Sequence, residues 1–275
     1  MKLFDKVAIV GTGLIGGSIG LGLKKNRLSN QIIGVSFHKK SIALAKKRGV
    51  IDIGSRDLKV IKDADLVVLA TPVGTILKLA PSVAKIIKKE CIVIDVGSTK
   101  KEIVLKLEKI FPNYIGTHPL AGSEKRGILN ARDDLFKNSL CLLTPTRNTL
   151  AFNRKKIEEL WIHLGAKVFS LTPARHDEIL SFISQLPHIA AFSLIGAIPK
   201  EFLKFASTGL KDTTRIAASD SEIWADIFLT NQKNILKAIK VFETRLALIK
   251  RAIKKRNQAL LNRLLVDAKK KREIL

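Results

Sequence analysis

Short apolar runs alternate with stretches of helical periodicity through the first part of the chain. The runs lack polar alternation, which is typical of strands that are buried on both faces of a sheet. Strands that alternate with helices in this way predict a doubly wound parallel sheet with helices on both faces. The expected strands are residues 7–10, 32–36, 65–70, 91–95, 114–117, 140–144 and 167–171, and the expected helices are 13–25, 39–48, 74–89, 100–110 and 154–164.

The pattern changes at residues 172 and 173, a Thr-Pro pair, after which long helical periods dominate. We therefore predict an α/β domain over residues 1–172 and an all-helical domain over residues 173–275. The expected helices of this second domain are 173–184, 187–195, 201–206 and 223–268. The last of them carries an apolar stripe at helical spacing, which the protein's own core or a second subunit must cover. The stripe consists of Ile235, Ile239, Phe242, Leu246, Ile249 and Ile253.

Three glycines with the spacing G-x-G-x-x-G follow the first strand directly and open the first helix. In this context Gly11 permits a tight turn, Gly13 lets the backbone approach a pyrophosphate, and Gly16 allows helix and strand to pack closely. The amide groups at the helix start would bind the phosphates. This motif predicts a dinucleotide site, against the simpler interpretation of a buried glycine turn without a ligand. The predicted contacts also include Leu14, Ile15, Thr71 and Pro72.

The end of the second strand bears on the choice of nicotinamide cofactor. NAD-binding versions of this fold place an Asp or Glu there to bind the ribose hydroxyls. Here the position is Ser36, and residues 6–51 contain no acidic residue. Ser36 can hydrogen-bond a 2′-phosphate, and His38, Lys39 and Lys40 supply positive charge beside it. We therefore favour NADP over NAD, although the two lysines could also be ordinary solvated residues of a helix start.

Charge and cysteine content narrow the class of protein. The 275 residues include 49 Lys and Arg and 24 Asp and Glu, a net charge of +25. Such an excess attracts nucleic acids and anionic metabolites. With only 5% aromatic residues, a solvated basic surface is favoured over a nucleic-acid site. Cys91 and Cys141 lie in apolar runs without metal-ligand or C-x-x-C spacing, so we expect no metal site, a reducing compartment and a cytoplasmic protein. No apolar run suggests a membrane span.

Four polar clusters fall where chemistry is expected. Two follow strands, at the sheet edge where α/β proteins bind ligands: D-x-G-S-x-K at residues 95–100 and H-P-x-A-G-S-E at 118–124. The other two lie in the helical domain: S-Q-L-P-H at 184–188 and K-D-T-T-R-I-A at 211–217.

In this order the four clusters resemble the prephenate dehydrogenase family, which includes arogenate dehydrogenases, over essentially the whole chain. The resemblance implies a Rossmann domain followed by a helical dimerisation domain, hence a homodimer. It implies oxidative decarboxylation of a small anionic cyclohexadienyl acid, prephenate or arogenate, with hydride transfer to a nicotinamide cofactor in tyrosine biosynthesis. One departure is Gln185, where the family often has histidine.

The resemblance also implies roles for individual residues. His118 matches the catalytic histidine, and an imidazole suits proton transfer near neutral pH. Ser98 matches the serine that is placed beside the reacting hydroxyl. Arg215 matches the arginine that binds a substrate carboxylate, for which a guanidinium is well shaped. The remaining expected substrate contacts are His188, Ser123, Glu124 and Asp212. His176 and Asp177 are interpreted as a helix-start pair, and Trp224 as a core residue.

Two alternatives stay open at this point. The first is another dehydrogenase that joins a Rossmann domain to a helical domain, such as a hydroxyacid dehydrogenase or an imine reductase. The second is a non-catalytic, dinucleotide-sensing protein that binds nucleic acid, for which the net charge of +25 is the only support.

Overall fold

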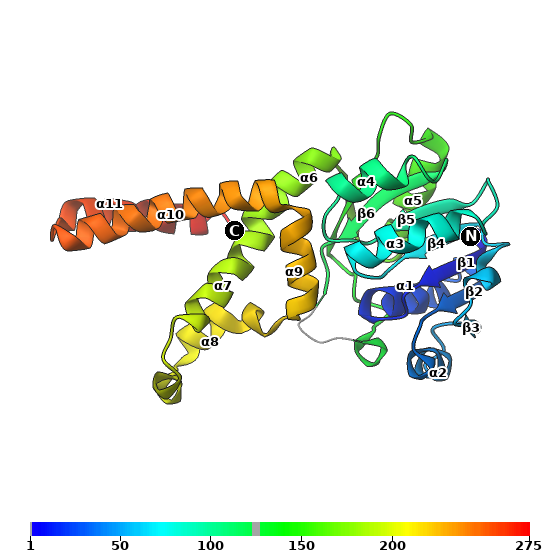
Figure 1. The fold of residues 1–275 in the computed structure, drawn as a ribbon, viewed down its shortest axis with the longest axis horizontal. Coiled ribbons are helices and arrows are strands. Elements are labelled where there is room, and N and C mark those ends of the chain that lie inside the picture. Colours follow the sequence, from blue (N-terminus) through cyan, green and yellow to red (C-terminus); the bar gives the residue numbers. More distant parts are fainter. Residues whose placement is uncertain (1, 123–126) are drawn as a thin grey trace.

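The computed structural model describes residues 2–122 and 127–275. Its first part contains one eight-stranded sheet of order β3-β2-β1-β4-β5-β6-β7-β8 (Figure 1). The order reverses beside β1, which is the arrangement of a doubly wound fold. The strands are β1 (Phe4–Val10), β2 (Ser29–Val35), β3 (Ile53–Ser55), β4 (Leu66–Leu69), β5 (Ile92–Asp95), β6 (Tyr114–Pro119), β7 (Leu140–Thr144) and β8 (Lys167–Ser170).

The sheet confirms the expected doubly wound, mostly parallel arrangement, but one pair of strands is antiparallel. Strands β1 to β6 are parallel, whereas β7 pairs with β6 in antiparallel orientation and β8 pairs parallel to β7. A parallel neighbour needs a crossover connection that is usually helical. Within the described residues, the chain between β6 and β7 forms only the short 3-10 helix η2 (Ile128–Asn130). The chain therefore returns antiparallel, and β3, which the apolar pattern did not predict, completes the other edge.

Successive side chains of the sheet point into two separate cores, which explains the unbroken apolar runs. On β1, Val7 and Ile9 join one cluster of buried side chains, while Ala8 and Val10 join the other. Strand geometry sends neighbouring residues to opposite faces, so both faces must be covered. Cys91 and Cys141 are free and buried in these two cores.

Five helices cover the two faces. Helices α1, α2 and α5 contribute to the first cluster through Ile19, Ala45 and Ile157, and α3 and α4 contribute to the second through Ile76 and Ile103. Their bounds are α1 (Leu14–Lys25), α2 (Lys39–Lys47), α3 (Val73–Ala84), α4 (Lys101–Leu107) and α5 (Ala151–His163). The 3-10 helix η1 (Leu58–Ile61) connects β3 to β4.

The second part of the chain is helical (Figure 1). Its helices are α6 (Pro173–Leu180), α7 (Leu186–Gly196), α8 (Thr208–Thr214), α9 (Ser221–Thr230), α10 (Gln232–Lys254) and α11 (Gln258–Arg272), with the π segment η3 (Ser181–Gln185) and the 3-10 helices η4 (Lys200–Phe205) and η5 (Arg215–Ala218). Thr172 caps α6 by accepting a hydrogen bond from the Arg175 N–H.

Two predicted helix boundaries are wrong. The helix expected over 223–268 is three helices, because Asn231 leaves the helical conformation at φ −120° and Arg256 adopts a φ of 48° in the turn before α11. Conversely, α6, η3 and α7 run on without the break expected before Pro187. A proline lacks the N–H that an α-helix needs, and the wider π turn before it alters the hydrogen-bond pattern.

By length and apolar composition alone, one helical segment of the described chain could cross a membrane, namely Pro173–Gly196. Core helices of soluble proteins pass the same test. This segment carries the buried pair His176 and Asp177, which is hydrogen-bonded to the sheet domain. Its length and apolar composition are therefore weak evidence that this segment spans a membrane.

Two carboxylates of the helical part join it to the sheet part at helix N-termini. Asp177 of α6 accepts hydrogen bonds from the backbone N–H groups of Lys100 (2.7 Å) and Lys101 (2.9 Å) at the start of α4. Asp226 of α9 accepts one from the Gly74 N–H of α3 (3.0 Å). The first N–H groups of a helix have no partner within it and attract negative charge. These bonds fix the position of the helical part against the carboxyl edge of the sheet.

Candidate active site

The glycine loop between β1 and α1 is tightly packed at two of its three motif glycines and open at the third. Gly11 has a φ of +104°, and a Cβ there would lie 2.4 Å from the Ala70 carbonyl oxygen. A Cβ on Gly16 would lie 2.0 Å from the Gly11 carbonyl oxygen. By contrast, a Cβ on Gly13 would meet no atom within 4 Å. Gly11 and Gly16 are thus required by packing, whereas Gly13 faces open space at the start of α1.

Unpartnered polar groups surround this loop and fit a bound nicotinamide dinucleotide. The hydroxyl oxygens of Thr12 and Thr71 are buried without a hydrogen-bond partner. Gly13 caps α1 without a side-chain hydrogen bond, and no acidic residue lies in the first turn of the helix. Leu14 begins that turn and is followed by Ile15, while Pro72 precedes α3. Buried hydroxyls normally have partners, so these residues fit a cofactor that would satisfy them.

The four residues predicted to contact the 2′-position cluster at the end of β2. Ser36 donates its backbone N–H to the Ser55 carbonyl oxygen (3.2 Å), and its Oγ accepts the His38 N–H (3.3 Å). Lys39 and Lys40 begin α2, and both are exposed, as is His38. No acidic residue lies in the first turn of α2, so this region is polar and cationic.

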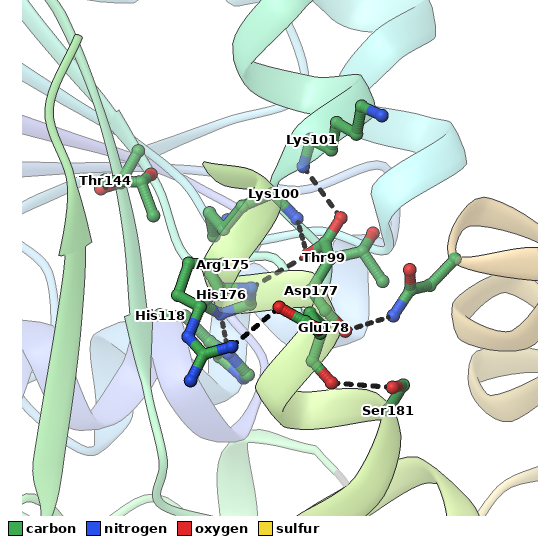
Figure 2. Close-up of polar contacts among 12 residues, drawn as sticks. Thr99, Lys100, Lys101, His118, Thr144, Arg175, His176, Asp177, Glu178 and Ser181 are labelled. Atoms are coloured by element: carbon green, nitrogen blue, oxygen red, sulfur yellow. Dashed lines mark hydrogen bonds and ion pairs between the residues drawn. The ribbon is translucent and has the colours of Figure 1, made fainter. Parts of the chain in front are cut away.

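A chain of three hydrogen-bonded side chains runs from the sheet into the helical part (Figure 2). His118, near the end of β6, is half-buried, and its Nδ1 lies 2.9 Å from Nε2 of His176. Nδ1 of His176 lies 2.8 Å from Oδ1 of Asp177. His176 and Asp177 are 0% and 1% exposed, so water does not compete for these bonds.

His176 and Asp177 were not among the site residues predicted from the sequence. Their position after Thr172 and Pro173 explained them fully as a helix start. One available signal was periodicity, because His176 and the buried Leu180 are four residues apart and share a helix face. A His-Asp pair on an apolar face requires buried partners, and those partners lie far away in sequence.

A second buried cluster lies near the two imidazoles. Lys100 is fully buried and forms an ion pair with Asp95, whose other oxygen accepts a hydrogen bond from the Tyr114 hydroxyl (2.7 Å). Burial lowers the pKa of His118 well below its usual value, and the charges of His176 and Lys100 lower it further. Burial also lowers the pKa of His176, although its bond to Asp177 opposes this shift. Both rings are therefore neutral near pH 7.

His188 lies in a separate polar group on α7. Its ring stacks on Trp224 with centroids 3.5 Å apart, so Trp224 is a half-buried partner of His188 and not the core residue that the sequence predicted. Nδ1 of His188 donates to the Ser184 carbonyl oxygen (3.0 Å), because a carbonyl only accepts. Burial lowers the pKa of His188, and the nearby charge of Arg215 lowers it further.

The other predicted residues are distributed around these groups. Ser98 is half-buried in the turn between β5 and α4, two residues before Lys100. Asp212 is exposed on α8, one turn before Arg215. Ser123 and Glu124 lie outside the described residues.

A cavity of about 370 Å³ lies at the opposite edge of the sheet, near the amino ends of the strands, where Phe4, Asn30, Asp65 and Ile92 line it. Parallel α/β sheets bind ligands at the carboxyl edge. The glycine loop, the end of β2 and the series of His118, His176 and Asp177 lie at or beyond that carboxyl edge, so we place the candidate site there.

Comparison with known proteins gives a consistent result over both parts of the chain. Residues 19–170 match the family described as prephenate dehydrogenase, nucleotide-binding domain, and residues 172–267 match prephenate dehydrogenase, dimerization domain. The chain is 35% identical over 246 residues to a Bacillus subtilis prephenate dehydrogenase, a match that spans 86% of this chain and 66% of that protein.

Solved structures agree with the sequence matches. The fold is similar to that of prephenate dehydrogenase from A. aeolicus in complex with hydroxyphenyl propionate and NAD+, with a TM-score of 0.93, 34% identity, and coverage of 98% of this chain and 97% of that one. It is also similar to Synechocystis arogenate dehydrogenase, with a TM-score of 0.84, 30% identity, and coverage of 98% and 99%.

The glycine loop generates a paired prediction. Gly13→Ala should fold normally but bind a reduced nicotinamide dinucleotide, NADH or NADPH, about 10- to 100-fold more weakly, because its methyl group occupies the space next to the helix N-terminus and disrupts charged hydrogen bonds. Gly16→Ala should instead lower the melting temperature, because its Cβ collides with backbone. Fluorescence titration and thermal melting measure both effects. Equal melting losses in the two variants, or unchanged dinucleotide affinity in Gly13→Ala, would contradict this assignment.

Proposed function

Because this chain belongs to the prephenate dehydrogenase family, we propose that it catalyses the oxidative decarboxylation of prephenate or arogenate in tyrosine biosynthesis, with NADP as the preferred cofactor. The observation that carries this proposal is the hydrogen-bonded series of His118, His176 and Asp177 at the carboxyl edge of a dinucleotide-binding sheet. It supports a neutral imidazole that can accept a proton next to the cofactor.

The reaction requires three bonds of the substrate to break. A bound nicotinamide would supply the acceptor for the hydride that leaves the ring carbon carrying the hydroxyl group. His118 accepts the hydroxyl proton as the carbonyl forms. The electron pair of the bond to the ring carboxylate then enters the ring and displaces the carbonyl π pair onto oxygen. Carbon dioxide leaves, the ring becomes aromatic, and the oxygen takes up a proton to give a phenol. Ser98 is proposed to hydrogen-bond the same hydroxyl group, a role that its position in the β5–α4 turn supports.

The second polar group is proposed to bind the acidic end of the substrate. Arg215 would bind a carboxylate through its guanidinium, for which two parallel hydrogen bonds are favourable. His188 and Trp224 would contact the same part of the substrate, with the stacked rings holding each other in place. Asp212, Ser123 and Glu124 are proposed as further polar contacts to the substrate.

The preference for NADP rests on the residues of this chain. The A. aeolicus relative was solved with NAD+, so a nicotinamide cofactor is common to both proteins. At the end of β2, however, this chain has Ser36 with exposed His38, Lys39 and Lys40 around it. A carboxylate there would repel a 2′-phosphate, and its absence favours NADP.

We further propose a homodimer formed through the helical domain, residues 173–275, with the boundary to residues 1–172 at the start of α6. The dimerization-domain match supports this assembly. So does the apolar stripe of α10, where Phe242, Leu246 and Ile253 are 43%, 55% and 61% exposed. Sedimentation velocity of the full chain tests the assembly. The free buried Cys91 and Cys141 suit a reducing, cytoplasmic location.

The two alternative functions have less support. Both domain matches carry the prephenate dehydrogenase description, which disfavours a hydroxyacid dehydrogenase or an imine reductase. A nucleic-acid-binding role is supported only by the net charge of +25. The same charge suits small anionic substrates.

The proposal predicts a specific pattern of turnover. Prephenate or arogenate should be oxidised with a higher kcat/KM for NADP than for NAD, and Ser36→Asp should reverse that preference by at least about tenfold, because a carboxylate repels the 2′-phosphate. Steady-state assays of both substrates with both cofactors measure this. No turnover in any combination contradicts the function, whereas a preference for NAD in the unmodified chain contradicts only the cofactor assignment.

Two substitutions should separate chemistry from substrate binding. His118→Asn should lower kcat roughly 10²–10⁴-fold, as expected for a lost general base, with unchanged cofactor affinity. Arg215→Ala should mainly raise the KM for the substrate, because a carboxylate loses its partner. Near-normal turnover of the first variant, or an unaltered KM in the second, counts against these roles.

The pH profile follows from the lowered pKa of His118. A general base works in its unprotonated form, so a lowered pKa keeps the base active at more acidic pH. We expect kcat/KM to stay constant from about pH 8 to below about pH 6.5, the usual histidine value, and to fall only in more acidic solution. His118→Asn should lack this acidic limb. A midpoint at or above the usual histidine value would contradict the proposed environment.

A further inference from the structure

The hydrogen bonds around Asp177 determine where its neighbours carry protons. Main-chain N–H groups can only donate, so the carboxylate oxygens accept from Lys100 (2.7 Å) and Lys101 (2.9 Å). Oδ1 also lies 2.8 Å from Nδ1 of His176. Since this oxygen accepts, Nδ1 of His176 is the nitrogen that carries the proton.

The proton on His176 in turn determines the tautomer of His118. A neutral imidazole carries one N–H, so Nε2 of His176 has a lone pair, and it lies 2.9 Å from Nδ1 of His118. Two lone pairs at this distance repel, so Nδ1 of His118 must carry its proton and donate. Nε2 of His118 is then left with the lone pair that a general base needs.

We propose that His176 and Asp177 are positioning residues that hold His118 in its Nδ1–H tautomer, so that the helical part of the chain determines which nitrogen of the base is free. This inference rests on the proposed role of His118 as the base. After proton transfer the same bonds remain favourable, because the His118 imidazolium still donates from Nδ1 to His176. The arrangement resembles the orienting role of the carboxylate in Ser-His-Asp triads, with a second imidazole inserted.

Asp177 is held from several sides, which makes it suitable for orienting a neighbour. The start of α4 supplies two donors, and Asn231 donates to the Asp177 carbonyl oxygen (2.8 Å) as well as to Oε1 of Gln185 (2.7 Å). Gln185 therefore supports this scaffold. Lys100 contributes a buried positive charge nearby, so protonating both rings would be costly.

The competing explanation is that Asp177 only joins the two domains. Asp226 offers a matched control, because it forms the same type of bond, from a carboxylate to the backbone N–H of a helix start, at Gly74. The structure records no bond from Asp226 to either imidazole among the described residues. Loss of Asp226 therefore tests domain joining without a direct effect on the tautomer.

The direct test is nitrogen NMR of the full chain labelled with ¹⁵N-histidine, which has five histidines. His118→Asn identifies the signals of His118. In the unmodified protein near pH 7, Nδ1 of His118 should show a protonated nitrogen and Nε2 an unprotonated one. In Asp177→Asn the new amide can donate to His176 and invert its tautomer, so the His118 signals should shift toward Nε2–H. His176→Phe, which keeps the Asp177 bonds to α4, should also remove the tautomer preference.

Turnover provides the second readout. Asp177→Asn and His176→Phe should lower kcat roughly 10²–10⁴-fold, with little change in cofactor affinity, because the base presents the wrong nitrogen. The acidic limb of the pH profile should move, because His176 and Lys100 act on His118 directly. Asp177, Lys100 and Asp95 act on His176, Tyr114 bonds to Asp95, and Cys141 contacts the His118 backbone. Asp226→Asn should retain the His118 tautomer and most of its turnover.

The inference is overturned by an unchanged His118 tautomer in both Asp177→Asn and His176→Phe, or by an Nε2–H tautomer in the unmodified protein. Equal loss of turnover in Asp177→Asn and Asp226→Asn, without a tautomer change in either, would also overturn it in favour of domain joining. The NMR measurement needs no substrate. It therefore decides this inference even if the unmodified chain oxidises neither prephenate nor arogenate, a result that would reject only the proposed function.

Discussion

The N–H groups at the starts of α3 and α4 have no partner within their own helices, and the rest of the arrangement depends on this constraint. A buried helix end needs partners, and here the partners are Asp226 and Asp177 of the helical part. Meeting this need fixes one half of the chain against the carboxyl edge of the other half. The same carboxylate that satisfies α4 also bonds to His176, so helix capping and the orientation of the candidate base are one interaction network.

Burial limits the hydrogen-bond arrangements that this network can adopt. Solvated imidazoles and carboxylates exchange partners with water, but His176 and Asp177 are almost fully enclosed and Lys100 is fully buried with Asp95. Removing one member of a buried ionic pair is costly because its partner is left uncompensated. The cluster therefore has few alternative arrangements, and this restriction suits a site where one particular nitrogen must remain free.

The sequence predicted the features that local chemistry determines. The apolar runs located seven of the eight strands because most of these strands are buried on both faces. The glycine spacing identified the loop after β1, where the geometry demands Gly11 and Gly16 and leaves open space at Gly13. The sequence did not predict the antiparallel return of β7 or the connection of His118 to His176. These depend on how segments far apart in the chain meet, and His176 after Thr172 and Pro173 has a sufficient local explanation as part of a helix start.

The π segment Ser181–Gln185 lies between the two polar groups of the site, with His176 before it and His188 after it. A π turn accommodates about one more residue than an α turn. Deleting a residue there would restore regular α geometry and rotate everything beyond it by about 100° about the helix axis. His188 would then face away from Trp224. A single surplus residue thus sets the angular relation between the group that contains His176 and the group that contains His188.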